Sequence, residues 1–173
     1  METLVDFLNW AWARHHNSLS WYVRPLFILP FAYFAYMKSA RGMAWTVVAL
    51  VSSMFWFPAP ATADQTATTF LAVERDWITG PLTLGRLVLT ALIPVWFIAL
   101  AGAFRRRSWA AAALVIVAGT ALKLAWSFYM AGASAWAIVP PVAVGNAICA
   151  GVLFYAYWRT KRPAESSSNW SRS

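Results

Sequence analysis

The chain has 173 residues, of which 61% are hydrophobic and 12% charged, and its mean hydropathy is +0.55. Because a soluble domain carries about 25% charged residues, this composition argues against a water-soluble globule. The formal charge is +8, but the cations are scattered between apolar runs, so no nucleic-acid-binding surface is expected. A single cysteine, Cys149, permits neither a disulfide framework nor a cysteine-based metal site within one chain.

Residues 1–20 are predicted to form an interfacial amphipathic segment, with a helix over 3–14 lying on the membrane surface. Four apolar residues recur there at helical spacing: Leu4, Phe7, Leu8 and Ala11. Acidic residues stand early in this segment and no basic region precedes an apolar stretch, so a cleaved signal peptide is not expected. The stretch 66–77 repeats the amphipathic pattern, with Phe70, Val73 and Trp77 on one side.

Five windows are long and apolar enough to cross a hydrocarbon core, which takes roughly 17 to 25 helical residues. They are 21–37, 43–57, 82–104, 109–130 and 136–158. The second window is the shortest, and it reaches a spanning length if it begins nearer Ala40 and runs to Pro58. The sequence therefore predicts an all-α bundle of about five transmembrane helices over 21–158, with an outer loop at 58–81. The segment 159–173 is expected to be a basic and then disordered cytoplasmic tail.

Lysine and arginine follow an alternating pattern in the predicted loops, which fixes the expected orientation. Cations gather between spans one and two, between spans three and four, and after span five: Lys38, Arg41, Arg105, Arg106, Arg107, Arg159, Lys161 and Arg162. The other two connections are acidic or uncharged. The pattern predicts an outer N-terminus and a cytoplasmic C-terminus in a bacterial-type cytoplasmic (inner) membrane. In a competing topology span two is a re-entrant hairpin, which places Arg105 to Arg107 outside.

The chain is tryptophan-rich, with twelve Trp among 17% aromatic residues. Many of these aromatic residues stand near predicted span ends, where amphipathic rings favour the headgroup layer. They are Trp21, Tyr22, Trp56, Trp77, Trp109, Tyr129, Trp136, Tyr157 and Trp158. Interfacial belts and helix packing explain most of them, and an aromatic box for a flat ligand is the alternative.

Ionisable side chains inside a span are costly and normally face protein or water. Arg24, Arg86 and Lys123 fall in the outer part of spans one, three and four. Thr120, Lys123 and Ser127 share one helical face, and Asn146 lies near the middle of span five. These residues predict an outward-facing cationic cup for an anionic or lipid-headgroup ligand. The candidate ligand-binding residues are Arg24, Arg86, Lys123, Thr120, Ser127, Asn146, Glu74 and Asp76.

A structural role for the same cations is the competing interpretation. Glu74 and Asp76 in the outer loop are available to neutralise Arg86 and Arg24. Arginine and lysine near a span end can also reach phosphate headgroups without a specific ligand. A small-residue face on span five, Ala143, Ala147 and Gly151, is expected to pack that span against a neighbouring helix.

The sequence contains few residues or motifs that indicate catalysis or cofactor binding. His15 and His16 are adjacent and therefore point about 100° apart on a helix, which is a weak zinc pair unless Glu74 or Asp76 joins them. Both histidines are expected at the solvent or the headgroups. No span carries a histidine for haem, and no nucleophile or nucleotide motif occurs, so no cofactor and no resident metal are expected.

Three functions remain open at this point. The first is a small binding or transport protein, acting as a homo-oligomer, with the bilayer and anionic lipid headgroups as partners. The second is a non-catalytic accessory subunit or assembly factor of a larger membrane complex. The third is an outer-face lipid-modifying enzyme in which Glu74 or Asp76 acts as general base, assisted by His15 or His16. The absence of a catalytic motif makes enzymatic activity the least favoured.

Overall fold

Helices cover 87% of the residues that the computed structural model describes, 2–62 and 64–161, and these ranges contain no strand. The chain is therefore all-α over these residues, as the sequence predicts. In chain order the elements are α1 (Glu2–His15), α2 (Ser18–Val23), the 3₁₀ turn η1 (Arg24–Phe27), α3 (Ile28–Tyr36), α4 (Ala40–Ser52), the 3₁₀ turn η2 (Ser53–Phe55), α5 (Gln65–Thr79), α6 (Leu84–Arg105), α7 (Trp109–Ala131), the 3₁₀ segment η3 (Gly132–Ile138) and α8 (Val139–Lys161).

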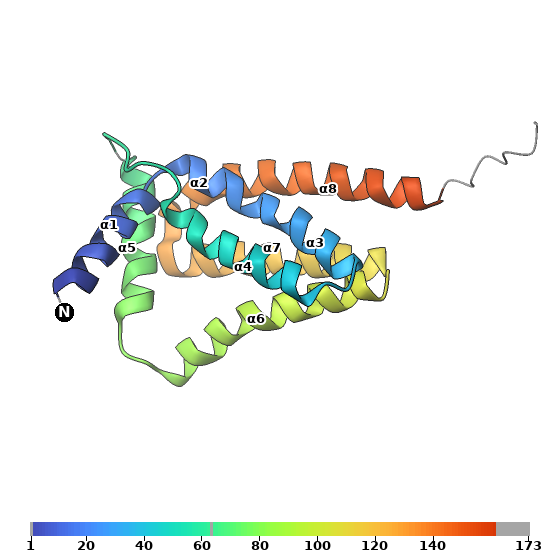
Figure 1. Ribbon diagram of the computed structural model, residues 1–173. Helices are drawn as coiled ribbons and strands as arrows, with labels where there is room; N and C mark the ends of the chain where they lie inside the picture. Colours follow the sequence, from blue (N-terminus) through green and yellow to red (C-terminus); the bar gives the residue numbers. More distant parts are fainter. Residues whose placement is uncertain (1, 63, 162–173) are drawn as a thin grey trace, which may run out of the picture.

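Helices α3, α4, α6, α7 and α8 run lengthwise through the molecule, and α1 and α5 lie across one end of them (Figure 1). We call this the α5 end; it also contains η2 and η3, which contact α1 and α5. The opposite end holds the 37–39 and 105–108 turns and the end of α8, and we call it the cationic end. There, Arg105 donates a hydrogen bond to the Lys38 carbonyl over 3.4 Å, and the Arg107 guanidinium lies 4.7 Å from the Tyr36 ring centroid.

The two turns at the cationic end are built alike. Lys38 and Arg107 both adopt left-handed backbone conformations, with φ of 57° and 56°, one residue beyond the C-caps of α3 and α6. The next residue in each turn, Ser39 or Ser108, donates its backbone N–H to a carbonyl in the last turn of the preceding helix. Such a left-handed residue ends a helix by satisfying its last carbonyls. Each turn reverses the chain within a few residues and displays its cations at the same end of the molecule.

The first predicted span, 21–37, is not one regular helix. It consists of the end of α2, the η1 turn and α3, and α2 and α3 have only 6 and 9 residues. Pro25 explains the change because it has no backbone N–H to donate to the preceding turn. This break places Arg24 at the first position of η1, where the helix tightens into 3₁₀ geometry.

Two helical segments are long and apolar enough to cross a membrane, Leu84–Arg105 and Trp109–Lys161. The second has 53 residues and comprises α7, η3 and α8. It turns at Gly132, whose φ is +53°, and α8 then runs back beside α7 (Figure 1). The helix from Ala40 to Phe55 is apolar but shorter, so the five spanning helices expected from sequence are not established by length and composition alone.

The exposure of these helices differs from that of a soluble core. Only 17% and 22% of the most apolar windows in the two candidate spans are buried inside the protein. Large apolar side chains such as Ile98, Leu114 and Phe154 are more than two-thirds exposed. Exposed apolar surface on this scale indicates contact with lipid or another protein, so the described helices support association with a membrane.

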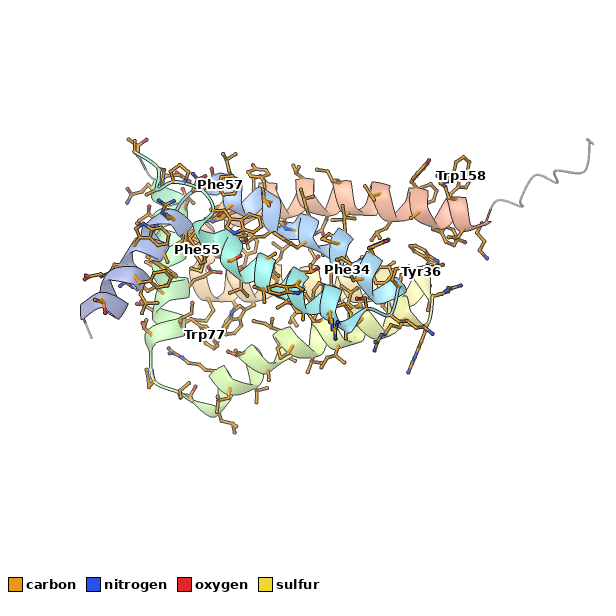
Figure 2. All side chains as sticks on the ribbon, in the orientation of Figure 1. Phe34, Tyr36, Phe55, Phe57, Trp77 and Trp158 are labelled. Carbon is orange, nitrogen blue, oxygen red and sulfur yellow. The ribbon has the colours of Figure 1, made fainter. Side chains whose placement is uncertain are left out.

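Aromatic side chains occur at both ends of the molecule, and others, such as Phe34, lie between them (Figure 2). Figure 2 shows Phe55, Phe57 and Trp77 at the α5 end and Tyr36 and Trp158 toward the cationic end. The aromatic belts expected at the two membrane surfaces stay a prediction.

Two buried clusters divide the interior along the helix axes. One joins α3, α6 and α7 toward the cationic end, around Phe31, Leu100 and Phe104. The other joins α2, α5 and η3 at the α5 end, around Trp21, Phe70 and Leu71. A cavity with a mostly apolar wall and a few polar side chains lies between these two regions.

The segments outside the predicted spans are largely helical. The interfacial helix expected over 3–14 corresponds to α1, and the amphipathic stretch at 66–77 corresponds to α5 within the expected outer loop 58–81. On α5 the buried face is formed by Ala67, Phe70 and Leu71, and Val73 and Trp77 are only half-buried. Most of the disordered tail expected at 159–173 lies outside the described residues, since α8 continues to Lys161.

Candidate functional site

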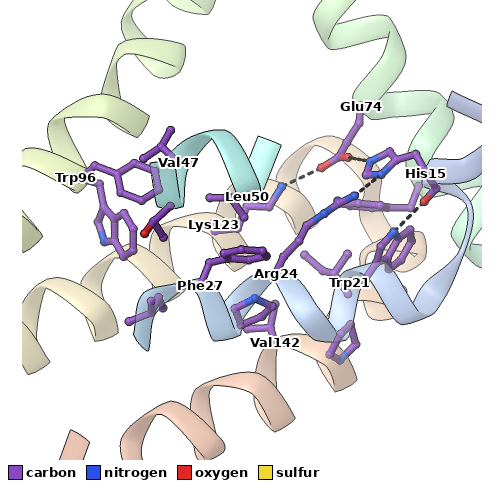
Figure 3. A pocket seen from close by; sticks show the side chains of 17 residues that line it. His15, Trp21, Arg24, Phe27, Val47, Leu50, Glu74, Trp96, Lys123 and Val142 are labelled. Atoms are coloured by element: carbon purple, nitrogen blue, oxygen red, sulfur yellow. Dashed lines mark hydrogen bonds and ion pairs between the residues drawn. The ribbon is translucent and has the colours of Figure 1, made fainter. Parts of the chain in front are cut away.

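A cavity of about 280 Å³ lies near the α5 end, and every helix from α1 to α8 contributes to its wall (Figure 3). Most of its wall is apolar, and four polar side chains project into one region of it. Those four are His15, Arg24, Glu74 and Lys123. The remaining lining side chains are Trp21, Pro25, Phe27, Ile28, Thr46, Val47, Leu50, Phe70, Trp96, Phe97, Ile138, Pro141 and Val142.

His15 is fixed in this cavity by the turn between α1 and α2. Asn17 caps α2 by accepting a hydrogen bond from the Leu19 N–H over 3.0 Å, and its amide donates to the Pro58 carbonyl over 2.9 Å. The Trp21 indole donates to the His15 carbonyl over 3.0 Å. His15 is only 7% exposed, so the expectation that it lies at the solvent or headgroups is wrong. The indole of Trp21 and the α5 helix cover it instead.

Arg24 projects from η1 toward His15. Its guanidinium donates to His15 Nδ1 over 2.6 Å and to the Ser20 hydroxyl over 3.4 Å. Among the described residues, no carboxylate lies within 4.0 Å of it. The expected neutralisation of Arg24 by Glu74 or Asp76 is therefore not made by direct contact. A half-buried guanidinium has five N–H donors, and protein groups use only part of this capacity here.

Glu74 joins the two sides of the polar region. Asp64 caps α5 by accepting from the backbone N–H groups of Thr66 and Ala67, and Glu74 follows Phe70 by one helical turn on the same face. Its Oε1 accepts a hydrogen bond from Lys123 Nζ over 2.9 Å. Its Oε2 lies 3.7 Å from His15 Nε2, which is long for a hydrogen bond.

Burial lowers the pKa of His15, and the positive charge of Arg24 lowers it further, against the opposing effect of Glu74. Burial by itself raises the pKa of Glu74, but the interactions with His15 and Lys123 outweigh burial and lower the pKa to about 2. At neutral pH, His15 is therefore uncharged and Glu74 is ionised. Because Arg24 donates to Nδ1, the remaining ring proton of His15 lies on Nε2, toward Glu74.

The four polar side chains carry a net charge of +1 at neutral pH. Arg24 and Lys123 supply two positive charges, Glu74 one negative charge and His15 none. Lys123 also lies over the Phe70 ring, 5.7 Å from its centroid, and its side chain is 51% exposed. The cavity therefore combines an excess positive charge, an accessible ammonium group and an apolar wall.

Arg86 lies outside this cavity. It donates to the Trp77 carbonyl over 3.1 Å, and its guanidinium is 5.1 Å from the centroid of the Trp77 ring. The single cup expected from sequence is therefore incomplete, because α6 begins near the end of α5 and turns Arg86 toward the α5–α6 connection. Asp76 is exposed and does not line the cavity either.

Three further predicted residues also lie outside the cavity. The Asn146 amide donates to the Thr120 hydroxyl over 3.1 Å, which links α8 to α7. Asn146 lines a second cavity of about 370 Å³ between these helices, toward the cationic end. Ser127 is buried, and its hydroxyl has no hydrogen-bond partner among the described residues. The depth of these residues was predicted, but their side chains point to different parts of the molecule.

His15 and Glu74 are held in protonation states that do not suit proton transfer at neutral pH. His15 Nδ1 accepts from Arg24 and its other nitrogen faces Glu74, so neither nitrogen is free to take a proton from a substrate. A carboxylate with a pKa near 2 is also a poor general base at neutral pH. Within the described ranges, no group of three or more His, Cys, Asp or Glu could hold a metal ion.

His15 is the site residue that sequence reasoning did not assign to ligand binding. The sequence suggested His15 beside Glu74 only as a metal or catalytic candidate, and its position two residues before Asn17, a residue type that favours helix caps, predicts a tight turn. Comparisons with protein-family models, curated proteins and solved structures found no match to this chain.

Proposed function

We propose that the chain is a five-span membrane protein with the α5 end outside and the cationic end in the cytoplasm. Lys38, Arg105 and Arg107 lie together at one end, in agreement with the rule that cytoplasmic loops carry excess cations. Helices α1 and α5 lie across the other ends of the long helices, as surface helices do (Figure 1). Spans one and two then consist of α2 to α3 and α4 to η2.

The contact between Arg105 and Lys38 supports this topology over the re-entrant alternative. If α4 returned to the side from which it entered, the two turns would face opposite sides of the membrane. The guanidinium of Arg105 instead donates to the Lys38 carbonyl, 67 residues earlier in the chain. Such proximity favours a complete crossing by both α4 and α6.

Within this topology, the protein binds an anionic ligand in the cavity at the α5 end. The observation that carries this proposal is Arg24, a half-buried cation that projects into an apolar cavity without a carboxylate partner among the described residues. Burying a charge is costly unless an opposite charge compensates it. Glu74 acts on Arg24 only through space, and an anion bound beside Arg24 and Lys123 supplies a direct partner.

Native mass spectrometry tests this proposal on protein extracted from its own membrane in a lipid-preserving polymer. We expect unaltered protein to retain one defined anionic species, and Arg24→Gln or Lys123→Met to lose it. Arg86→Met is the matched control, since it removes a cation that lies outside the cavity. Retention by all the variants, or loss by Arg86→Met alone, would contradict the proposal.

An accessory subunit is the second candidate, and one observation favours it. Ala143, Ala147 and Gly151 are exposed on α8, whereas the sequence predicted that they pack against a neighbouring helix. A Cβ atom at Gly151 would meet nothing within 4 Å. Exposed small residues permit close approach of another transmembrane helix. This candidate predicts a stoichiometric protein partner that is lost on Ala147→Leu or Gly151→Leu, whereas Gly102→Leu on α6 retains it.

A further inference from the structure

The cavity has the two-part character of an amphiphile-binding site. Figure 3 shows the polar side chains Arg24, His15, Glu74 and Lys123 together, while Phe27, Val47 and Trp96 form an apolar wall beyond them. The Trp96 indole is held in place because its N–H donates to the Val115 carbonyl over 2.9 Å. A ligand that fills the cavity therefore needs a polar head at one side and an apolar body at the other. This inference rests on the proposed anion-binding function.

The chain already places one carboxylate in the polar region. Glu74 offers one oxygen to Lys123 and directs the other toward the ring nitrogen of His15. The donors around it thus fit a planar group with two oxygens and a single negative charge. With Glu74 in place the four polar side chains carry a net charge of +1, so the region already attracts an anion.

The Glu74 side chain is partly exposed and is not part of the buried face that packs α5. It is 30% exposed, and α5 is held by Ala67, Phe70 and Leu71 rather than by the carboxylate. A turn of the Glu74 side chain toward solvent would uncover Lys123 without displacing the helix. Lys123, half-exposed at the edge of the cavity, would then be available to an incoming head group.

We propose that the ligand is an amphiphilic carboxylate of the fatty-acid class, whose head replaces the Glu74 carboxylate at Lys123. Arg24 supplies the second positive charge beside the bound head. The hydrocarbon chain lies against Phe27, Trp96 and Phe97, where its burial is favourable. In the unliganded protein Glu74 acts as a built-in competitor for the same donors.

Binding of laurate, dodecanol and dodecyl phosphate to the full chain in phosphatidylcholine nanodiscs tests this proposal, with tryptophan fluorescence as the readout. Trp21 and Trp96 line the cavity and report on its occupancy. Unaltered protein is expected to bind laurate about tenfold more tightly than dodecanol, since hydrogen bonds to charged groups are involved. Glu74→Gln is expected to tighten laurate binding about fivefold by removing the competitor. Asp76→Asn is the matched control and leaves binding unchanged, and Lys123→Met weakens it.

Each other outcome counts against a different part of the argument. Tighter binding of dodecyl phosphate than laurate would overturn the carboxylate assignment and leave the anion pocket standing. Equal binding of laurate and dodecanol would overturn the anion pocket as well. Weaker laurate binding by a folded Glu74→Gln protein would overturn the competitor role. If Glu74→Gln does not fold, the comparison of the three ligands on unaltered protein still decides the ligand class.

Discussion

Lys123 Nζ lies 2.9 Å from Glu74 Oε1, although the two residues are 49 positions apart in the chain. This contact ties α7 to α5 at the edge of the cavity. It also sets the electrostatics there, since Lys123 helps to lower the pKa of Glu74 to about 2, against burial and together with His15.

The stability contributed by this ion pair is expected to be modest, because Lys123 is half-exposed. Lys123→Met and Glu74→Gln should each lower the free energy of unfolding by roughly 0.5 to 1 kcal/mol, measured by denaturant unfolding in detergent. The double variant should lose less than the sum of the two, because both changes remove the same contact. Asp76→Asn combined with Lys123→Met is the additive control. Full additivity of the Glu74 pair would show that the contact is not made.

Acidification is expected to destabilise the protein in two pH ranges, one set by His15 and one by Glu74. The pKa of His15 in the folded protein lies below the ordinary value of 6.5, so the unfolded chain takes up this proton first. The corresponding stability is present above pH 6.5 and is lost as the pH falls below it. The pKa of Glu74 falls from 4.5 to about 2, so its stability is present above pH 4.5 and is lost progressively toward pH 2.

Unfolding temperature measured as a function of pH checks both ranges. His15→Gln should remove the loss in the upper range, and Glu74→Gln should reduce the loss in the lower range. His16→Gln leaves His15 in place, so this variant is expected to lose stability in both pH ranges, as the wild-type protein does. A wild-type unfolding temperature that does not change between pH 7 and pH 5, a window of about two units around the ordinary histidine pKa, would contradict the buried, neutral state of His15.

The packing of η1 on α8 depends on Gly145. A Cβ atom at this position would collide with the Pro25 ring. Gly145→Ala is therefore expected to lower stability by about 1 to 3 kcal/mol, the usual cost of overpacking. Gly151→Ala is the control on the same helix, because it meets open space and gains about 0.5 to 1 kcal/mol from helix propensity. Equal thermal stability of the two variants would show that η1 and α8 are not in close contact.

Single-cysteine labelling in intact cells tests the orientation. Lys38→Cys and Arg106→Cys are expected to react with a membrane-impermeant reagent only after the cells are opened. Thr62→Cys and Ala133→Cys are expected to react already in intact cells. All four positions are exposed, and the native Cys149 is buried, so Cys149→Ala provides a suitable background. Reaction of Lys38→Cys and Arg106→Cys from opposite sides would support the re-entrant topology instead.

The helix bounds were the most predictable part of the fold. The windows 82–104 and 109–130 correspond closely to α6 and α7, because long apolar runs end at clear cap and charge signals. The break at Arg24–Phe27 was less predictable, since a proline in a span is often only a kink. Similarly, α8 begins at Val139, later than the window predicted from 136, because residues 132–138 form a 3₁₀ segment.

The candidate site was predicted only in part. Arg24 and Lys123 were named from their charge and depth and Glu74 as an outer-loop carboxylate, and the structure places all three around one cavity. Periodicity could not give the direction of Arg86, which depends on how the α5–α6 connection turns. The burial of His15 was missed because two separate elements cover it. Trp21 lies beyond the turn that follows His15, and α5 is distant in the sequence.

The central claim is that the cavity beside Arg24 and Lys123 holds an anionic ligand. A side-chain-resolution density map of the protein, purified from its own membrane without ligand exchange, tests it most directly. We predict elongated density inside the cavity, with its polar end at Arg24 and Lys123 and its apolar end against Trp96. A cavity that contains only protein side chains or water, with Glu74 still bound to Lys123 in every molecule, would contradict the claim.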